Sequence, residues 1–380
     1  MHKIIIACDS YKGCLTSREV NETIASGLRD DDADNGCPSD PDTVAIEMSD
    51  GGEGMLDAFL AATGGERIML RAHDSLMRWI DACYGVVDTN RAGAAADSSP
   101  GTNEGKTAII EIAQTAGLAL IEPEQRNPLR TTSWGVGEMV MDAYRRGIRH
   151  FIVGLGGSAT SDCGIGMLKA MGDDWQKVCR DCTFVLASDV TNPLCGQHGA
   201  ARVFAPQKGA DSAMVDTLEA RAIRFAEACS RHFSYDRSDC PGAGAAGGLG
   251  YAFLQFFNAQ FRPGAELLFE ATDFDALLSD ADIVVTGEGH SDAQTLMGKL
   301  PYRVLQHVMG KRTAGRPQTW LVSGGVSDRQ ALCDTGFDRI VAVSPTTMPI
   351  HEAMLPKTAK ANIVAATRLL RDVIKAQNVK

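Results

Sequence analysis

The sequence predicts an α/β protein in which a parallel-sheet domain carries a second, mixed α+β domain as an insertion. Three observations support this fold class: a length of 380 residues, six short runs rich in Ile and Val, and glycine turns leading into helical stretches after most of these runs. A chain of this length exceeds what a single hydrophobic core usually serves, so two domains are expected.

The six apolar runs are the expected central strands. Each is apolar on consecutive positions, as in strands that are covered on both faces, and the runs alternate with helical stretches. This pattern is typical of a Rossmann- or flavodoxin-like sheet. The runs are "KIIIAC" (3–8), "TVAIEM" (43–48), "HFIVGL" (150–155), "DIVVTG" (282–287), "TWLVSG" (319–324) and "RIVAVS" (339–344).

The segments that follow the first five runs combine glycine, small polar residues and the start of a helix. In an open parallel sheet such turns gather at the carboxyl ends of the strands, where ligands bind. We therefore expect several of them to meet in one crevice. They read "DSYKGCLTSREV", "SDGGEGMLDAF", "GGSATSDCGIGML", "EGHSDAQTL" and "GGVSDRQAL".

The middle of the chain has a different pattern, which is typical of a mixed α+β domain. It contains "IDACYGVVD", "KTAIIEIA", "TFVLASDV" and "ARVFAPQKG", followed by a helical run from Met214 to His232. We assign residues 1–65, 131–172 and 274–380 to the parallel-sheet domain, and residues 66–130 and 173–273 to the inserted α+β domain.

Composition narrows the classes of partner. The formal net charge is −11, and no cluster of Lys and Arg suited to a phosphate backbone occurs, so nucleic acid is not an expected partner. The apolar stretch in "MHKIIIACDS" is too short for a signal peptide, and no run of about eighteen apolar residues suggests a membrane span.

Cysteine usage favours a cytoplasmic location. Eleven cysteines spread thinly over the chain fit a reducing compartment better than a disulfide framework. Cys179 and Cys182 form one C-x-x-C without a second pair, and "HEAML" at 351 is not H-E-x-x-H, so no zinc enzyme is indicated.

The glycine turn "GLGGSATSDCGIGML" (154–168) raises the question of which anion it binds. Its G-x-G-x-x-A favours a NAD(P)-dependent hydroxy-acid dehydrogenase, but such a site also needs an acidic residue at the end of the next strand. Asp173 and Asp174 have the spacing, yet "GIGMLKAMGDD" places them at a helix end. A second match, "GAGAAG" at Gly242, follows no strand. "GTNEGKT" at 101–107 is one residue short of a P-loop and precedes an expected strand, so we interpret it as a hairpin turn.

Beside these turns stand side chains of both charges, as phosphoryl transfer requires. Cations neutralise the transferred group, carboxylates hold Mg²⁺, and one carboxylate accepts the proton of the attacking hydroxyl. The set is Lys12 and Lys208 with Asp9, Asp50, Glu53, Asp162, Asp189, Glu288 and Asp292.

Eight segments, in order along the whole chain, resemble the signature blocks of the type I glycerate kinases. They are "DSYKGCLTSREV", "MSDGGEGMLDAF", "RNPLRTTSWGVGE", "GLGGSATSDCGIGML", "ASDVTNPLCG", "PQKGA", "PGAGAAGGLG" and "TGEGHSDAQTLMGK". The resemblance implies a two-domain α/β enzyme that uses ATP and Mg²⁺ to phosphorylate D-glycerate, with its site in a cleft between the domains.

The chain departs from the family pattern at several places. "DSYKGCL", "GSATSDCG" and "APQKG" carry mild substitutions that keep Lys12, Asp162 and Lys208. A larger difference lies between "MLKAMG" and "FVLASDV", where only "DDWQKVCRDCT" stands in place of a few tens more residues. An alternative is therefore a homologue that binds its ligands but has impaired catalysis.

The resemblance and the residue types together nominate Asp189, Lys12 and Asp292 as candidate catalytic residues. Asp189 acts as general base or orients the acceptor hydroxyl, or it caps the turn before Asn192. Glu288 and Asp292 are the candidate Mg²⁺ ligands, although Asp292 could also cap a helix. His290 beside them is interpreted as incidental.

The remaining candidates bind substrate or phosphate. Glu53 could instead stabilise a helix dipole, and Ser158 and Thr160 could cap their helix. The sequence does not distinguish the 2- from the 3-hydroxyl of glycerate, nor does it give the oligomeric state. The candidates are Asp9, Ser10, Asp50, Gly51, Gly52, Glu53, Gly156, Gly157, Ser158, Thr160, Asp162, Asn192, Gln207, Lys208, Gly242 and Gly244.

Overall fold

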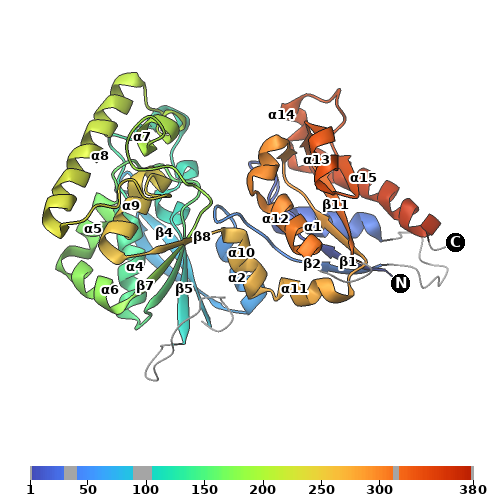
Figure 1. Ribbon diagram of the computed structural model, residues 1–380, viewed down its shortest axis with the longest axis horizontal. Helices are drawn as coiled ribbons and strands as arrows, with labels where there is room; N and C mark the ends of the chain where they lie inside the picture. Colours follow the sequence, from blue (N-terminus) through green and yellow to red (C-terminus); the bar gives the residue numbers. More distant parts are fainter. Residues whose placement is uncertain (1, 30–40, 89–104, 311–315, 378–380) are drawn as a thin grey trace. The chain divides into compact units, whose positions relative to one another are not determined.

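The computed structural model describes residues 2–29, 41–88, 105–310 and 316–377, and it divides into two compact units (Figure 1). Unit 1 comprises Met1–Asp50 and Leu268–Lys380, and unit 2 comprises Gly51–Leu267.

Unit 1 is built on a five-stranded, fully parallel sheet with the strand order β13-β11-β9-β1-β2. The strands are β1 (Lys3–Ile6), β2 (Asp42–Ala45), β9 (Ile283–Thr286), β11 (Gln318–Ser323) and β13 (Arg339–Ala342). A second, two-stranded parallel sheet pairs β10 (His290–Ser291) with β12 (Gly325–Val326).

Helices cover both faces of the larger sheet, which explains why its inner strands β1, β9 and β11 are mostly apolar and buried. One core cluster joins Ile4 and Ile6 to Ile24 of α1 (Ser17–Leu28) and Ile363 of α15 (Pro356–Gln377). A second cluster contains Leu321 with side chains of α12 (Leu300–Gly310) and α13 (Arg329–Thr335). Shorter helices are α11 (Phe274–Leu277), η7 (Leu278–Asp280), η8 (Ala293–Met297) and α14 (Ile350–Ala353).

Unit 2 is built on a six-stranded mixed sheet with the order β3-β4-β5-β6-β7-β8. The pairs β3–β4 and β4–β5 are antiparallel, and the other pairs are parallel. The strands are β3 (Glu66–His73), β4 (Trp79–Asp88), β5 (Lys106–Glu111), β6 (His150–Gly154), β7 (Thr183–Ala187) and β8 (Gln260–Arg262).

The helices of unit 2 pack around this sheet (Figure 1). The longest is α8 (Ser212–Phe233), whose N-cap is Asp211. The others are α2 (Met55–Thr63), α3 (Ala113–Ala116), η3 (Leu118–Leu120), η4 (Pro123–Gln125), α4 (Trp134–Arg145), α5 (Ile165–Met171), η5 (Gly172–Asp174), α6 (Trp175–Asp181), α7 (Ala200–Phe204), η6 (Pro206–Lys208) and α9 (Ala245–Phe257). The boundary between the units falls within α10 (Gly264–Ala271).

All six apolar runs form strands with parallel partners, which confirms the predicted α/β class. Two of them, β2 and β13, were expected as central strands but lie at the edges of the unit 1 sheet. The grouping of the strands differs from the expectation. Residues 131–172 were assigned to the N-terminal sheet with 1–65, but β6 pairs with β5 and β7 in unit 2. Residues 51–65 also belong to unit 2, which is one continuous segment. An apolar run predicts a buried strand, but it does not state which strands become its neighbours.

Two further segments bear on the sequence predictions. "ARVFAPQKG" forms helix α7 and the short helix η6, not a strand. Asp173 and Asp174 lie in η5 between two helices, so no strand connects the glycine turn to them. Part of the expected hairpin turn at 101–107 falls outside the described residues. Within the described part of the chain, no helix is long and apolar enough to cross a membrane.

Candidate active site

A cavity of about 590 Å³ lies in unit 1, at the carboxyl ends of the strands of its sheet. Segments that follow β1, β2, β9, β11 and β13 all contribute to its wall, as expected for an open parallel sheet. Five of the sequence-predicted residues line it: Asp9, Ser10, Lys12, Asp50 and Glu288.

Hydrogen bonds from α1 fix the segments that carry these residues. The amide of Asn21 accepts from the backbone N–H of Cys8 and donates to the carbonyl of Ile46. The hydroxyl of Ser17 donates to the carbonyl of Cys8 and accepts from the N–H of Met48. Both side chains are buried, so they hold the chain after β1 and after β2 at fixed positions beside each other.

The charged end of the cavity brings carboxylates and a lysine close together. Lys12 Nζ lies 2.8 Å from Asp50 Oδ2, and Asp9 Oδ1 accepts from the N–H of Ser10 at 2.7 Å. Burial, together with the nearby carboxylates of Asp50 and Glu288, raises the pKa of Asp9 to about 7. Burial lowers the pKa of Lys12, but Asp50 and Asp9 outweigh it and the pKa is raised. Asp9 therefore lies near two other carboxylates, and Lys12 offsets only part of their effect on it.

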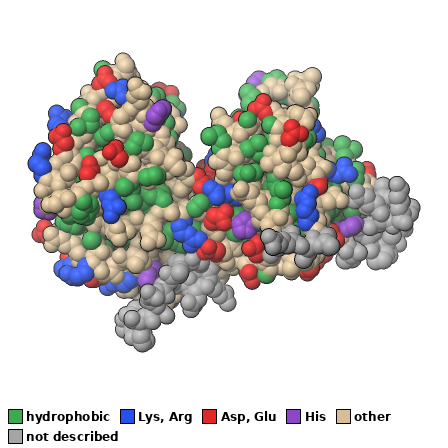
Figure 2. Space-filling view, viewed as in Figure 1, with side chains coloured by type: hydrophobic (Ala, Val, Ile, Leu, Met, Phe, Trp, Pro, Cys, Tyr) green, Lys and Arg blue, Asp and Glu red, His purple; other side chains and the backbone are tan. Residues whose placement is uncertain are grey.

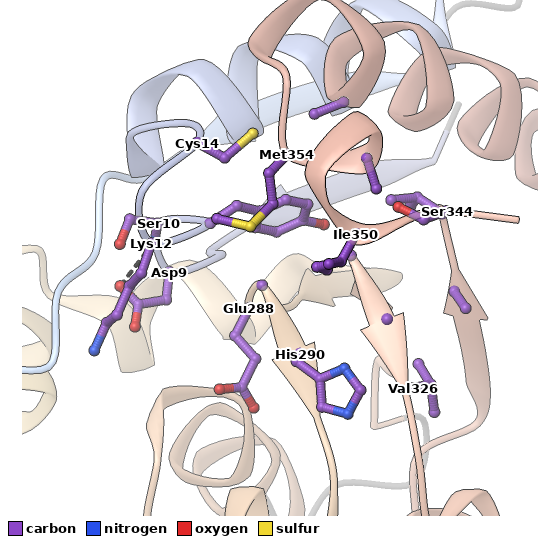
Figure 3. Close-up of a pocket in the computed structure, with 18 of the residues that line it drawn as sticks. Asp9, Ser10, Lys12, Cys14, Glu288, His290, Val326, Ser344, Ile350 and Met354 are labelled. Carbon is purple, nitrogen blue, oxygen red and sulfur yellow. Dashed lines mark hydrogen bonds between the residues drawn. The ribbon is translucent and has the colours of Figure 1, made fainter. Parts of the chain in front are cut away.

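Glu288 is a buried carboxylate that its neighbours hold in one orientation. Its Oε1 accepts from Thr295 Oγ1 at 2.6 Å and from Ser291 Oγ at 3.2 Å. Its Oε2 lies 3.3 Å from Lys299 Nζ. The cavity reaches Glu288, Lys299 and the exposed side chain of His290 (Figure 3).

Asp292 is not among the residues that line this cavity. It is the N-cap of η8: its Oδ1 accepts from the N–H of Gln294, and its own N–H donates to Thr295 Oγ1. The capping interpretation of Asp292 is thus present in the structure, and a metal-binding role stays a prediction. Among the described residues, no group of three or more His, Cys, Asp or Glu side chains forms a ready metal site.

In unit 2, the glycine turn after β6 packs directly against the turn that begins at Gly51. The N–H of Gly156 donates to the carbonyl of Gly51 at 3.3 Å, and a Cβ on Gly156 would overlap the Cα of Gly52. Gly51 has a φ of +97°, and a Cβ there would lie 2.5 Å from the carbonyl oxygen of Ala187 at the end of β7. Only glycines allow these three strand-end segments to approach so closely. Glu53, two residues after Gly51, is exposed.

Asp162 ties the start of α5 to the start of α4. Its Oδ2 accepts from the N–H and hydroxyl of Ser133 and from the N–H of Gly166, and its Oδ1 accepts from the N–H of Gly164. Both carboxylate oxygens therefore serve the local structure. Direct contact of Asp162 with a ligand stays a prediction.

Lys208 is almost completely buried, with 2% of its surface exposed. Its Nζ donates to Ser158 Oγ at 2.8 Å and to the carbonyl of Thr160 at 2.7 Å. These two bonds fix the segment that follows Gly156 and Gly157. Burial lowers the pKa of Lys208 to about 7, although Asp162 partly offsets this effect. Gln207 beside it is exposed.

The remaining sequence-predicted residues of unit 2 lie in the segments that follow β6 and β7 and in the segment before α9. The N–H of Gly244 donates to the carbonyl of Asn192 at 2.9 Å, and the Asn192 side chain donates to the carbonyl of His198. Gly242 lies against the ring of Phe261. Gly157 follows Gly156 in the turn, and Asp189 is exposed two residues beyond the end of β7.

A second, smaller cavity of about 210 Å³ opens beside Asp162 in unit 2. Thr132, Ser161, Lys169 and Arg221 are among its lining residues. Within the described part of the chain, the buried hydroxyls of Thr160 and Ser161 have no hydrogen-bond partner.

Several lining residues were not predicted from the sequence. Lys299 stands in the quoted block "TGEGHSDAQTLMGK", so a search for cations beside the carboxylates could have found it. The segment 342–354 lines the unit 1 cavity and follows the sixth apolar run, and the strand-end rule could have located it. Lys169 and Arg221 lie on helices far apart in sequence, and no pattern joins them.

The fold and the charged strand ends define an α/β enzyme of the phosphotransferase class. The sequence model of the glycerate kinase family matches residues 4–178 and 173–375, and this chain belongs to that family. It is therefore a kinase, for which ATP is the phosphoryl donor.

Known relatives match over nearly their whole length. The glycerate 2-kinase of Escherichia coli is 33% identical, with 96% of each chain covered. The glycerate kinase of Haemophilus influenzae is 37% identical, with 90% of this chain and 91% of that protein covered. The crystal structure of a putative glycerate kinase 2 from Salmonella typhimurium superposes with a TM-score of 0.76 at 32% identity and covers both chains completely.

The shortened segment noted in the sequence lies where the two matched ranges meet, at residues 173–178. There α6 (Trp175–Asp181) leads directly into β7, which pairs with β6 over five residues. The sheet is therefore continuous across the shortened segment, and the strand that precedes Asp189 is in place.

Proposed function

We propose that this kinase transfers the γ-phosphoryl group of ATP to a hydroxyl of D-glycerate, which yields phosphoglycerate and ADP. The observation that carries the proposal is the match to glycerate kinases along almost the entire chain. The name of the Escherichia coli relative, a glycerate 2-kinase, favours the hydroxyl at carbon 2.

We further propose that Mg²⁺ accompanies ATP and is held by Glu288, with Asp9 as a second ligand. Mg²⁺ usually takes one or two protein carboxylates and completes its shell with water and substrate phosphates, so a preformed three-residue site is not required. The crowding of negative charge around Asp9 supports this choice. When bound, Mg²⁺ would neutralise charge on the transferred phosphoryl group. Lys12 would bind a phosphate from the same end of the cavity.

For the acceptor, the proposed residues lie in unit 2. The glycerate anion would bind beside the turn of Gly156 and Gly157. Because α5 begins only at Ile165 and the N–H of Gly156 already donates to the carbonyl of Gly51, the cations of the 210 Å³ cavity, Lys169 and Arg221, would supply the charge for it. Asp189 would accept the hydroxyl proton or orient the hydroxyl, since its exposed carboxylate is accessible to a substrate.

The test is ADP release by the purified protein in the presence of D-glycerate and Mg·ATP. We expect glycerate-dependent turnover in the wild type and a loss of about 10²- to 10⁴-fold in Asp189→Asn, the range expected for a general base. Asp216→Asn changes an equally exposed aspartate of α8 that pairs with Arg202, and it should leave turnover unchanged. Folded protein that releases no ADP in response to glycerate would contradict the proposal.

Three companion measurements separate the alternatives. Phosphorus NMR of the product distinguishes 2- from 3-phosphoglycerate. Absorbance of reduced nicotinamide during incubation with glycerate would reveal a dehydrogenase instead. A binding-only homologue would show a melting temperature raised by ATP without turnover.

We also propose a cytoplasmic location. The ten described cysteines are free thiols, which a reducing compartment explains. Fractionation of cells that produce the protein, followed by immunoblotting, tests this proposal.

A further inference from the structure

We propose that the 590 Å³ cavity of unit 1 is the ATP site, with the adenine at its apolar end and the phosphates at its charged end. The inference rests on the proposed function, because ATP is the donor of that reaction. It adds the location and orientation of the nucleotide and assigns a role to the segment 342–354, which the sequence did not single out.

Size is the first argument. Cavities of about 300–1,000 Å³ are typical of sites for ligands as large as a nucleotide. At about 590 Å³ the cavity fits ATP, whereas a three-carbon acid would leave most of it filled with water. The cavity of unit 2, at about 210 Å³, is too small for a nucleotide and has Lys169 and Arg221 on its wall, which suits a small anion.

The two ends of the cavity differ in chemistry. Figure 3 shows Asp9, Lys12 and Glu288 in one part of the pocket and Ile350 and Met354 in another. A ligand that fills the whole cavity therefore needs an apolar end and an anionic end, which a nucleotide has and glycerate lacks. The apolar side chains that line the cavity are Val326, Val343, Pro345, Met348, Ile350 and Met354.

The apolar end exposes surface that a flat ring would cover. Ile350 is 73% exposed and Met354 is 41% exposed, whereas Val343 behind them is buried. Exposed apolar side chains gathered on a cavity wall are typical of ligand sites, and a methionine thioether packs well against an aromatic ring. Ser344, in the same wall, adds a hydroxyl that could hydrogen-bond a ring nitrogen.

The charged end offers groups of both signs to a magnesium phosphate. Lys12 and Lys299 supply ammonium groups, and each already lies beside a carboxylate, Asp50 and Glu288 respectively. A Mg·triphosphate carries both a cation for the carboxylates and oxygens for the lysines. Gly289, Gly324 and Gly325 line the cavity as well, and a Cβ on Gly324 would overlap the carbonyl of Gly289, so this part of the wall is formed by closely packed backbone.

The experiment is equilibrium titration of the purified protein with Mg·ADP. Ala342 lines the cavity and is exposed, so Ala342→Trp should fill the apolar end without disturbing the core. We expect its Kd for Mg·ADP to rise at least tenfold. Ala331→Trp, an equally exposed alanine of α13 outside the cavity, is the matched control and should bind like the wild type.

A phosphate-only ligand tests the orientation. Magnesium pyrophosphate lacks the adenine, so Ala342→Trp should bind it as the wild type does. Lys12→Met should weaken Mg·ADP and magnesium pyrophosphate together. If Met354→Ala and Ala342→Trp both bind Mg·ADP with wild-type affinity, the adenine is not at this end and the inference is overturned.

The outcomes also separate this inference from the proposed function. In one outcome, the wild type and the variants bind Mg·ADP as expected, but the protein phosphorylates no glycerate. That result supports the nucleotide site and contradicts glycerate as the acceptor. In another outcome, the protein phosphorylates glycerate, but Ala342→Trp raises the KM for glycerate and not the KM for ATP. That result supports the glycerate kinase activity and overturns the proposed nucleotide site.

Discussion

Lys208 is a lysine in the interior of unit 2, and its pKa links the stability of the fold to pH. The folded-state pKa of about 7 lies below the ordinary value of 10.5 because burial disfavours the charged form. Between these two values the unfolded chain binds a proton that the folded chain does not. The free energy of unfolding therefore rises as the pH increases from about 7 to 10.5. This gain in stability is lost again as the pH falls back to 7.

We predict that Lys208→Met removes this dependence. In urea titrations at pH 7, 8 and 9, the free energy of unfolding of the wild type should rise relative to that of the variant. Above the folded-state pKa of about 7 the rise should approach about 1.4 kcal/mol per pH unit, the value for one proton. Cysteines that titrate in the unfolded state are common to both proteins and cancel in the difference. Equal pH slopes for the two proteins would show that Lys208 stays charged in the folded state.

Glu288 and Asp292 are four residues apart, and the sequence proposed both as Mg²⁺ ligands. Glu288 lines the unit 1 cavity, whereas Asp292 caps η8. We predict that Glu288→Gln raises the Mg²⁺ concentration for half-maximal activity at least tenfold, because the amide carries no charge. Asp292→Asn should leave the Mg²⁺ requirement unchanged, since asparagine is as good an N-cap as aspartate.

Kinetic titration with Mg²⁺ at saturating ATP measures this difference. Glu352→Gln on α14, outside the residues that line the cavity, is the control for a loss of one negative charge. An Asp292→Asn variant with the same tenfold change would instead support the two-ligand prediction made from the sequence.

At the scale of elements, the turn at Gly51 and Gly52 shows how glycines allow strand-end segments to pack. Gly51 and Gly54 both have positive φ, but their surroundings differ. A Cβ at Gly51 would meet the carbonyl of Ala187, whereas nothing lies within 4 Å of a Cβ at Gly54. Substitution of Gly54 therefore tests backbone strain alone, whereas substitution of Gly51 tests backbone strain together with steric overlap.

We predict that Gly54→Ala lowers the free energy of unfolding by about 1 kcal/mol, the cost of a left-handed backbone for a residue with a side chain. Gly51→Ala should cost at least about 2 kcal/mol more, because the backbone of β7 must shift. Urea unfolding of both variants provides the measurement. Equal losses would mean that the turn moves away from Ala187 at little cost.

The elements themselves were largely predictable, because their signals are local. Each of the six consecutive apolar runs contains a strand with a parallel partner, and the run from Met214 to His232 lies within α8. The short strands β8, β10 and β12 have two or three residues each and leave too brief a pattern. "ARVFAPQKG" has no clear period, and it forms α7 and η6, with α7 packed against α8 and α9.

The site was predictable to the extent that the strand-end rule applies. Asp9 and Lys12 follow β1, Asp50 follows β2 and Glu288 follows β9, and the structure brings these residues to one cavity. The burial of Lys208 was not predictable, because the bonds of its Nζ to Ser158 and Thr160 join residues about fifty positions apart. The segment 342–354 follows the sixth apolar run, so the strand-end rule could have located it, although its hydrophobic residues carry no chemical motif.

At the scale of the whole molecule, strand pairing decides which segments fold together. β6 is bonded to β5 on one side and β7 on the other, with five residue pairs on each side. Phe151 and Val153 of β6 lie in the main core of unit 2. A domain assembled without this strand would leave backbone groups of two strands and a large apolar surface unpartnered.

We predict that residues 51–267, produced alone, fold into a unit that melts cooperatively, as followed by circular dichroism and size-exclusion chromatography. The segment is continuous and contains the whole six-stranded sheet. The comparison protein joins residues 66–130 to 173–273 through a short glycine-serine linker, which reproduces the inserted domain predicted from the sequence. That protein lacks β6, α4 and α5, so it should show no cooperative transition, since β5 and β7 cannot pair through the missing strand. Cooperative melting of the linked protein, with an unfolded 51–267 segment, would favour the domain boundaries inferred from the sequence over those of the structure.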